Sequence, residues 1–259
     1  MNLSLINGYN RRSLLVLAVL FSAFAVVGMI WWKLLYLNRF SVDRSFVALW
    51  LFMIAMLSWD PQPAKDLPLA LVAMAGGLTL EWWGTHTGLW VYFTRERPPL
   101  WILVAWPVST LAIDRIYRAL NRCAPREEAR WSLPYWLTIT LFIAAMTRFA
   151  WPTIGFPTTQ GVVALMVVVM VSGRTPRHDV LLFVAGSLLG VFLETWGTSH
   201  FCWTYYTREV PPPVAACAHG FASVAFVRIV TLLRGTLPAI APRAGLTLSS
   251  KLTRRTTSL

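Results

Sequence analysis

Long apolar runs set the strongest limit on what this chain can fold into. Several runs of roughly 15 to 23 residues are bounded by charged residues or prolines, and a membrane-spanning helix needs about 20 apolar residues. Hydrophobic residues make up 56% of the 259 residues, while only 13% are charged. Because the surface of a soluble domain needs more charge than this, we predict an all-α membrane protein.

We expect about eight transmembrane helices. They cover residues 14–35, 45–59, 66–84, 98–120, 132–150, 158–172, 179–197 and 211–233. The first run follows Arg11 and Arg12 and resembles a secretory signal, with a cleavage site near Ala23-Phe24-Ala25. Its place in the repeat that follows favours a retained helix.

One stretch of the sequence occurs twice. Residues 81–99 recur as residues 194–212 at a constant offset of 113, and Glu, Trp, Gly, Thr, Trp, Tyr, Thr, Arg, Glu, Pro and Pro stand in register. Such identity is a strong repeat signal. We therefore predict two tandem parallel four-helix repeats, residues 1–122 and 123–235, followed by a loosely ordered basic cytoplasmic tail over 236–259. An even number of helices points both copies the same way.

The basic residues are explained by membrane topology. The net charge is +12, but lysine and arginine stand mainly in short loops between apolar runs, so we expect no nucleic-acid partner. Most of them fall on one side. This predicts an integral membrane protein of the bacterial inner membrane, with both termini cytoplasmic and the repeated stretches toward the outer face. A homo-oligomer is left open.

Glu81 and Glu194 are the first candidates for chemistry. Each stands within an apolar run, where an ionisable side chain is costly and is a functional candidate by default. Gly77 and Gly190 precede them by four residues, and residues four apart share one helix face. Small residues mark close helix packing, so we expect both carboxyls to face the protein interior. We predict that Glu194 and Glu81 serve as proton donor and acceptor. The alternative is that the two carboxyls only hold neighbouring helices together.

Two further ionisable residues receive different interpretations. His219 falls within the last predicted helix, and Trp106 takes its place in the first copy. It is a candidate proton relay to Glu194, or else a packing residue. Asp114 stands beside Arg115, and Val227 replaces it in the second copy. We interpret Asp114 as part of a structural ion pair.

Aromatic residues recur in register around each glutamate. The candidates for lining a substrate cavity are Trp83, Trp90, Tyr92, Trp196, Trp203 and Tyr205. Aromatic faces attract cations, so a buried acid that protonates an alkene could have its carbocation sheltered by such a wall. The alternative is an aromatic belt at the membrane interface.

The sequence gives no sign of a metal or cofactor. A metal site built from Glu81, His86, His200 and Glu194 can be imagined, but no pair has ligand spacing on one helix. The three cysteines also lack paired spacing. We expect neither a metal nor a cofactor. Asp66 and Asp179 stand in register at the starts of two predicted helices, where a carboxylate can cap free N–H groups.

The first copy resembles a known family. Glu81, Gly84, Thr87-Gly88, Tyr92, Pro99-Leu100 and Ala105-Trp106 are similar to the signature of the integral-membrane carotenoid-biosynthesis family that includes bisanhydrobacterioruberin-type hydratases. The resemblance implies a polytopic enzyme that hydrates or rearranges isoprenoid double bonds. Leu89-Trp90-Val91 stands where that signature has Phe-Gly, and the second copy has Ser199-His200 in place of Thr-Gly.

The leading hypothesis is a membrane enzyme that performs acid–base chemistry on an isoprenoid or carotenoid-like lipid. Glu81, Glu194 and His219 would act on the proton during hydration, cyclisation or isomerisation. A proton-coupled transporter or flippase of a lipid or small hydrophobic molecule is the first alternative, because parallel repeats with intramembrane carboxylates also fit transport. A membrane scaffold or assembly protein is the second.

Overall fold

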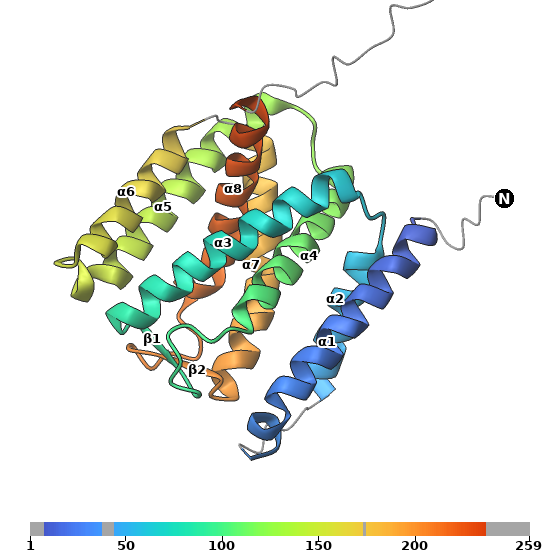
Figure 1. Cartoon of the computed structure of the whole chain (residues 1–259). Coiled ribbons are helices and arrows are strands. Elements are labelled where there is room, and N and C mark those ends of the chain that lie inside the picture. The colour runs from blue at the N-terminus through green and yellow to red at the C-terminus, as the bar shows by residue number, and fades with distance from the viewer. Residues whose placement is uncertain (1–7, 38–43, 173–174, 237–259) are drawn as a thin grey trace, which may run out of the picture.

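The computed structural model describes residues 8–37, 44–172 and 175–236, and these are mainly helical (Figure 1). The predicted tail lies outside the described residues apart from Thr236. In chain order the α-helices of the described part are α1 (Arg11–Leu37), α2 (Arg44–Ser58), α3 (Pro63–Thr87), α4 (Ile102–Cys123), α5 (Ser132–Ala150), α6 (Pro157–Val171), α7 (Pro176–Ser199) and α8 (Pro213–Thr236). Short 3-10 turns at Glu128–Trp131 and Trp151–Thr153 flank α5.

Within the described residues, five helices, rather than the eight that we predicted, are long and apolar enough to cross a membrane. They are α1, α3, α5, α7 and α8. The helices α2 and α6 have 15 residues each, and such a helix rises only about 22 Å, less than the hydrocarbon core of a bilayer. The helix α4 is long enough but carries Asp114, Arg115 and Arg118. The all-α membrane class is therefore supported, whereas eight full crossings are not.

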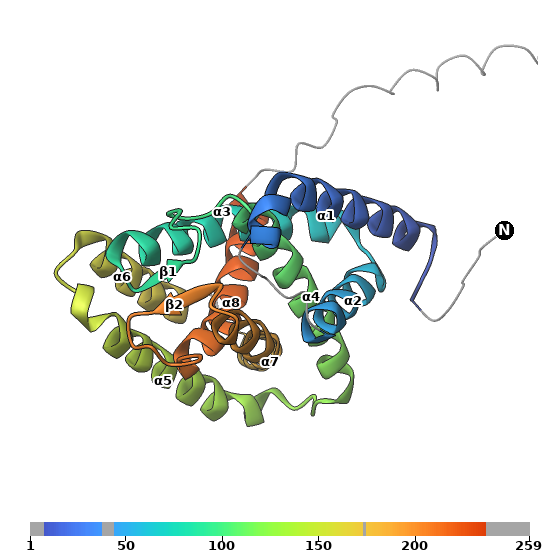
Figure 2. The same ribbon diagram turned by 90° about the horizontal axis from the view of Figure 1, so that it is seen from below.

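The helices α3, α4, α7 and α8 form the centre of the molecule, and two helix pairs flank it (Figures 1 and 2). In the centre, α3 packs on α4 and α7 packs on α8, while α4 contacts α7 and α3 contacts α8. On one side α2 packs on α4 and touches α7. On the other side α5 packs on α7 and α8, and α6 touches α3. The repeated sequence thus has matching contacts in the centre. At the flanks the contact of α2 with α7 matches that of α6 with α3, whereas the packing of α2 on α4 and of α5 on α7 and α8 has no counterpart of similar extent.

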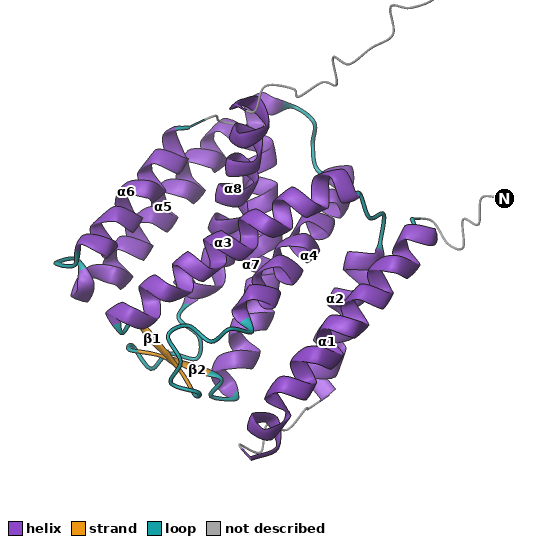
Figure 3. Cartoon of the chain, in the orientation of Figure 1, coloured by secondary structure: helices purple, strands orange, loops and turns teal. Residues whose placement is uncertain are grey.

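Two short strands, which the sequence analysis did not predict, join the two copies at one end of the bundle (Figure 3). Strand β1 (Trp90–Tyr92) pairs antiparallel with β2 (Trp203–Tyr205). In this register Trp90 faces Tyr205 and Tyr92 faces Trp203. Because Trp90 matches Trp203 and Tyr92 matches Tyr205 at the offset of 113, the pairing is reciprocal. Each copy contributes the same tryptophan and tyrosine to the contact, and Val91 lies opposite Thr204 between them.

The fourth helix of each copy begins later than we predicted. We expected starts at Pro98 and Pro211, but α4 begins at Ile102 and α8 begins at Pro213. A residue that precedes proline is disfavoured in the helical region because of a clash with the proline ring. Pro98 precedes Pro99, and Pro211 precedes Pro212. The first proline of each pair therefore stays in the connecting loop.

Candidate functional site

Glu81, near the end of α3, lies at the centre of a cluster of hydrogen-bond donors. Its side chain is buried, with 8% of the residue exposed. Its Oε2 atom accepts hydrogen bonds from Trp90 Nε1 at 2.8 Å and from the Tyr92 hydroxyl at 2.7 Å. Its Oε1 atom accepts one from Trp106 Nε1 at 3.1 Å. Glu81 acts only as an acceptor in these three contacts.

Glu194, near the end of α7, repeats this arrangement with one change. It is 6% exposed, and its Oε2 atom accepts hydrogen bonds from Trp203 Nε1 and from the Tyr205 hydroxyl, both at 2.9 Å. Its Oε1 atom lies 3.2 Å from His219 Nε2. His219 stands where the first copy has Trp106. A titratable imidazole thus replaces an indole at one position of an otherwise repeated cluster.

The glycines of the repeated motif make room for these rings. A Cβ atom on Gly84 would lie 1.9 Å from the Trp90 ring, and a Cβ atom on Gly197 would lie 2.0 Å from the Trp203 ring. Each tryptophan ring therefore lies across the helix that precedes its strand. It passes over the glycine, three residues beyond the glutamate, and reaches the carboxyl. Any larger side chain at either glycine would displace the ring and its hydrogen bond.

The tyrosine hydroxyls remain donors under ordinary conditions. Burial raises the pKa of Tyr92 well above its ordinary value, and the neighbouring Glu81 carboxyl raises it further. The pKa of Tyr205 is raised in the same way, first by burial and then by Glu194. Both hydroxyls therefore keep their protons across the usual pH range and hold the carboxyls in place.

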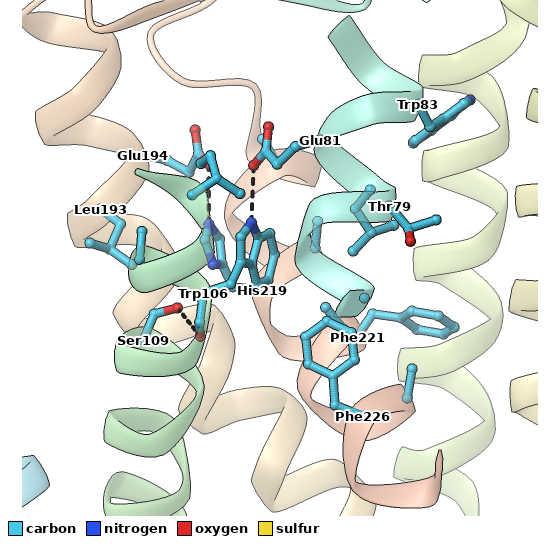
Figure 4. A pocket seen from close by; sticks show the side chains of 18 of the residues that line it. Thr79, Glu81, Trp83, Trp106, Ser109, Leu193, Glu194, His219, Phe221 and Phe226 are labelled. Carbon is cyan, nitrogen blue, oxygen red and sulfur yellow. Dashed lines mark hydrogen bonds and ion pairs between the residues drawn. The ribbon is translucent and has the colours of Figure 1, made fainter. Parts of the chain in front are cut away.

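The two clusters touch each other. Trp90 lies 5.9 Å from Tyr205, and Tyr92 lies 5.9 Å from Trp203, measured between ring centroids. The rings of Trp106 and His219 stack at 5.2 Å with an interplanar angle of 19°. Figure 4 shows these two rings side by side, each below its own glutamate. The site is one connected assembly of two copies.

A cavity of about 740 Å³ opens beside both carboxyls, within the range of small-molecule sites. Every predicted site residue lines it: Glu81, Glu194, His219, Trp83, Trp90, Tyr92, Trp196, Trp203 and Tyr205. Much of the remaining wall is apolar. It includes Trp50, Met146 and Met166 from helices on both flanks, and Phe221 and Phe226 from the central helix α8. The structure therefore brings all nine residues together. Four of their aromatic rings also bind the carboxyls, a role that the sequence analysis did not predict.

The remaining predictions concern residues away from the cavity. The imidazoles of His86 and His200 lie near the backbone oxygens of Trp82 and Trp196 in their own helices, at 2.9 and 2.8 Å. Asp114 pairs with Arg115 at 2.5 Å and with Arg118 at 2.7 Å, as predicted for a structural ion pair.

The sequence analysis did not predict two buried ion pairs, Asp66 with Arg115 and Asp179 with Arg228. Asp66 and Asp179 cap their helices by accepting hydrogen bonds from the backbone N–H groups of Gln62 and Thr175, as expected. Asp66 also binds Arg115 at 2.5 Å, and Asp179 binds Arg228 at 2.7 Å. All four residues recur in register at the offset of 113, so the repeat itself held the signal.

The arrangement can hold, give up and take back a proton beside an apolar cavity. Its parts are two carboxyls fixed by aromatic donors, one imidazole that can change its protonation state, and ring faces that can stabilise positive charge. No family model, curated protein or solved structure matches the chain. The case for a function therefore depends on this site.

Proposed function

We propose that this protein is a polytopic membrane enzyme that performs acid–base chemistry on an isoprenoid or carotenoid-like lipid. The reaction is a hydration, a cyclisation or an isomerisation of double bonds. The protein would reside in the bacterial inner membrane with both termini cytoplasmic. The observation that supports the proposal most directly is the contact between Glu194 and His219 at the wall of a large apolar cavity.

The free nitrogen of His219 is the atom that we assign to proton transfer. His219 Nε2 faces Glu194, while His219 Nδ1 is buried without a hydrogen-bond partner among the described residues. When Nε2 carries the hydrogen and donates it to the carboxyl, Nδ1 presents a lone pair. A carboxylate that orients an imidazole in this way also stabilises the imidazolium that forms when Nδ1 takes a proton. Glu194 thus positions the imidazole and balances its charge.

The reaction follows from this pair. The imidazolium delivers its Nδ1 proton to one carbon of a double bond, and positive charge develops on the neighbouring carbon. Isomerisation or cyclisation ends when Nδ1 takes a proton from an adjacent carbon. Hydration ends when water attacks the cation and Nδ1 takes the proton that the water loses. In each case the histidine returns to its starting state and needs no other reagent.

Glu81 would have a supporting role. Its three partners are indole and phenol groups, which do not exchange protons readily near neutral pH. A carboxylate fixed by such donors can stabilise positive charge on the substrate without moving a proton. The aromatic rings around it would add cation–π attraction. We therefore assign the proton steps to His219, which Glu194 orients, rather than to the two glutamates.

The test compares lipid extracts from cells that express the wild-type protein, Glu194→Gln, Glu81→Gln or no protein, by mass spectrometry. The wild type should change the isoprenoid or pigment profile. Glu194→Gln should lower conversion by about 10²- to 10⁴-fold, because His219 loses the carboxylate that orients its imidazole and balances the charge of the imidazolium. Glu81→Gln keeps an acceptor oxygen and should lower it much less. Equal amounts of each variant in the membrane, measured by immunoblot, are the control.

Two results would contradict the proposal. One is an identical lipid profile with and without the gene in a host that makes carotenoid precursors. The other is full conversion by Glu194→Gln.

One observation favours transport as a second candidate function. The cavity is lined not only by Glu194 but also by Arg228 and Leu232, further along α8, so it extends along the bundle. An elongated cavity with ionisable groups suits a proton-coupled lipid transporter. Movement of a labelled isoprenoid between the leaflets of reconstituted vesicles, without a change in its mass, would favour this function over the enzyme.

A further inference from the structure

Arg228 on α8 is a buried arginine whose hydrogen-bonding capacity is only partly used. It is 8% exposed. Its Nη2 atom donates to Asp179 Oδ2 at 2.7 Å and to the Tyr135 hydroxyl at 2.9 Å. Its Nε and Nη1 atoms are buried and have no partner among the described residues. A guanidinium carries five N–H donors, and buried donors without acceptors are costly.

The matching arginine of the first copy shows what a saturated site looks like. Arg115 is 0% exposed, and its Nε atom donates to the backbone oxygen of Trp59 at 2.9 Å. Its Nη atoms donate to Asp66 at 3.1 and 2.5 Å and to Asp114 at 2.5 Å. Every nitrogen of this guanidinium has an acceptor, as expected for a purely structural ion pair.

The difference between the two arginines has a cause in the sequence. Val227 stands where the first copy has Asp114, so Arg228 lacks the neighbouring carboxylate. Asp179 does not depend on Arg228 alone, because it also accepts hydrogen bonds from the backbone and hydroxyl of Thr175 at 3.1 and 3.2 Å. The second copy therefore retains an arginine with free donors.

Arg228 also lines the cavity that contains the two glutamates, whereas Arg115 does not. Arg228 follows His219 by nine positions on α8, and this offset corresponds to about 14 Å along a helix axis. The wall between them is largely apolar and includes Phe221, Ala222 and Ala225. The cavity wall thus carries an acid–base pair at one level of α8 and, nine positions further along, an arginine with two unpartnered donors.

We propose that Arg228 binds an oxyanion head group, a phosphate or a carboxylate, of an amphiphilic isoprenoid whose chain runs through the cavity toward Glu194 and His219. This substrate class rests on the proposed function. The head group would supply the acceptors that Nε and Nη1 lack, and hydrogen bonds between ions are stronger than neutral ones. The apolar chain would lie in the cavity along the apolar wall between Arg228 and the Glu194–His219 pair. The bond that reacts would then be set by its distance from the head group.

The test measures binding to the purified full-length protein in detergent by quenching of tryptophan fluorescence, since several tryptophans line the cavity. The probes are farnesyl phosphate, farnesol and inorganic phosphate. Wild type should bind farnesyl phosphate about tenfold or more tightly than farnesol, because a hydrogen bond to a charged group contributes on that order. Inorganic phosphate alone should bind far more weakly.

Two variants make the test specific for Arg228. Val227→Asp supplies the carboxylate that pairs with Arg115 Nη1 in the first copy. It should occupy Nη1 and neutralise the charge of Arg228, which should remove the preference for the phosphate and leave farnesol binding unchanged. Arg228→Gln should do the same. Asp179 loses a partner in Arg228→Gln, so unfolding of that variant is checked by size-exclusion chromatography. Val227→Asp keeps every native ion pair and decides the question if Arg228→Gln does not fold.

Several outcomes would overturn the inference: equal binding of farnesyl phosphate and farnesol by the wild type, an unchanged preference in Val227→Asp, or binding of inorganic phosphate as tight as that of farnesyl phosphate. Glu194→Gln separates this inference from the proposed function. It should bind farnesyl phosphate as the wild type does while losing lipid conversion. Lost conversion together with no phosphate preference would refute the head-group site and leave the acid–base site standing.

Discussion

The Glu81 cluster and the Glu194 cluster are built from the same residues and differ at one contact. Each carboxyl accepts hydrogen bonds from a tryptophan and a tyrosine of the strand that follows its helix. The third contact is Trp106 in the first cluster and His219 in the second. The shared contacts fix a carboxyl beside the cavity, and the differing contact decides whether that carboxyl is coupled to a group that titrates.

The same division separates the two arginines near the other end of the central helices. Arg115 has an acceptor for each nitrogen, whereas Arg228 has two nitrogens without partners among the described residues. In both comparisons the first copy is saturated and the second copy is open. Under the proposed function, the first copy is the structural half of the site and the second is the half that carries the proton chemistry.

The sharpest way to break this comparison is to exchange the differing residues. His219→Trp should lower lipid conversion by about a hundredfold or more, because it removes the titratable group while keeping an N–H donor for Glu194. Gly190 stands at the position of Gly77, which lies against the Trp106 ring in the first copy. Conversion is measured by mass spectrometry of lipids from membranes that contain the variant.

Trp106→His is the matched control. It changes the partner of Glu81 and the ring that stacks on His219 but leaves both Glu194 and His219 in place, so it should keep most of the conversion. If His219→Trp stays active, or if both exchanges lower conversion equally, the division into a structural and a chemical half is wrong.

A second test examines what the two clusters share. Gly84→Ala and Gly197→Ala each place a Cβ atom 1.9 or 2.0 Å from the ring of the tryptophan that binds the neighbouring carboxyl, which is too close for the ring to stay in place. Both should destabilise the protein by a similar amount, about 1–3 kcal/mol, the usual cost of overpacking. The measurement is thermal unfolding in detergent. Gly161→Ala in α6 is the control, since a Cβ atom there meets nothing within 4 Å, and unequal effects of the two variants would show that the clusters are not equivalent.

The smallest expected effect concerns the reactivity of Cys202, which lies beside β2 where the first copy has Leu89. Burial raises the pKa of the Cys202 thiol to about 12. Because only the thiolate reacts, iodoacetamide at pH 8 should label the exposed Cys123 and leave Cys202 unlabelled. Labelling of Cys202 should increase as the pH rises toward 12 or when detergent unfolds the chain. Rapid labelling at pH 8 in the folded protein would show that this side of the second cluster opens.

The sequence predicted the positions of the two glutamates well, for a physical reason. Gly77 and Gly190 lie one turn before the glutamates on the same helix face, and small residues lie where helices pack closely. In the structure a Cβ atom on Gly190 would meet the backbone of Ala216 at 2.2 Å. That face is buried, and so are both carboxyls. The aromatic lining followed from the same repeat, because identical residues at a constant offset occupy matching places.

The contacts of the site could not be predicted in the same way. The pairing of β1 with β2 involves three residues from each strand, too few for a period-2 pattern to stand out. The predicted number of membrane crossings was too high because local apolarity does not decide whether a helix can cross. Charged residues in α4 and the short lengths of α2 and α6 set these three helices apart from the five long apolar ones. The free donors of Arg228 depend on Val227 and on the cavity wall, so they emerge only when distant segments are placed together.

The reciprocal register of β1 and β2 bears on how such a protein could have arisen. Two identical chains that met through this strand pair would form the same contacts, Trp opposite Tyr and Tyr opposite Trp, as in any isologous dimer. The two halves of such a dimer carry the same residue at equivalent positions. The stack between positions 106 and 219, which are equivalent, would therefore join two indoles or two imidazoles and never one of each. Joining the halves in one polypeptide releases that restriction. Gene fusion is thus the step after which a proton donor could evolve on one side alone.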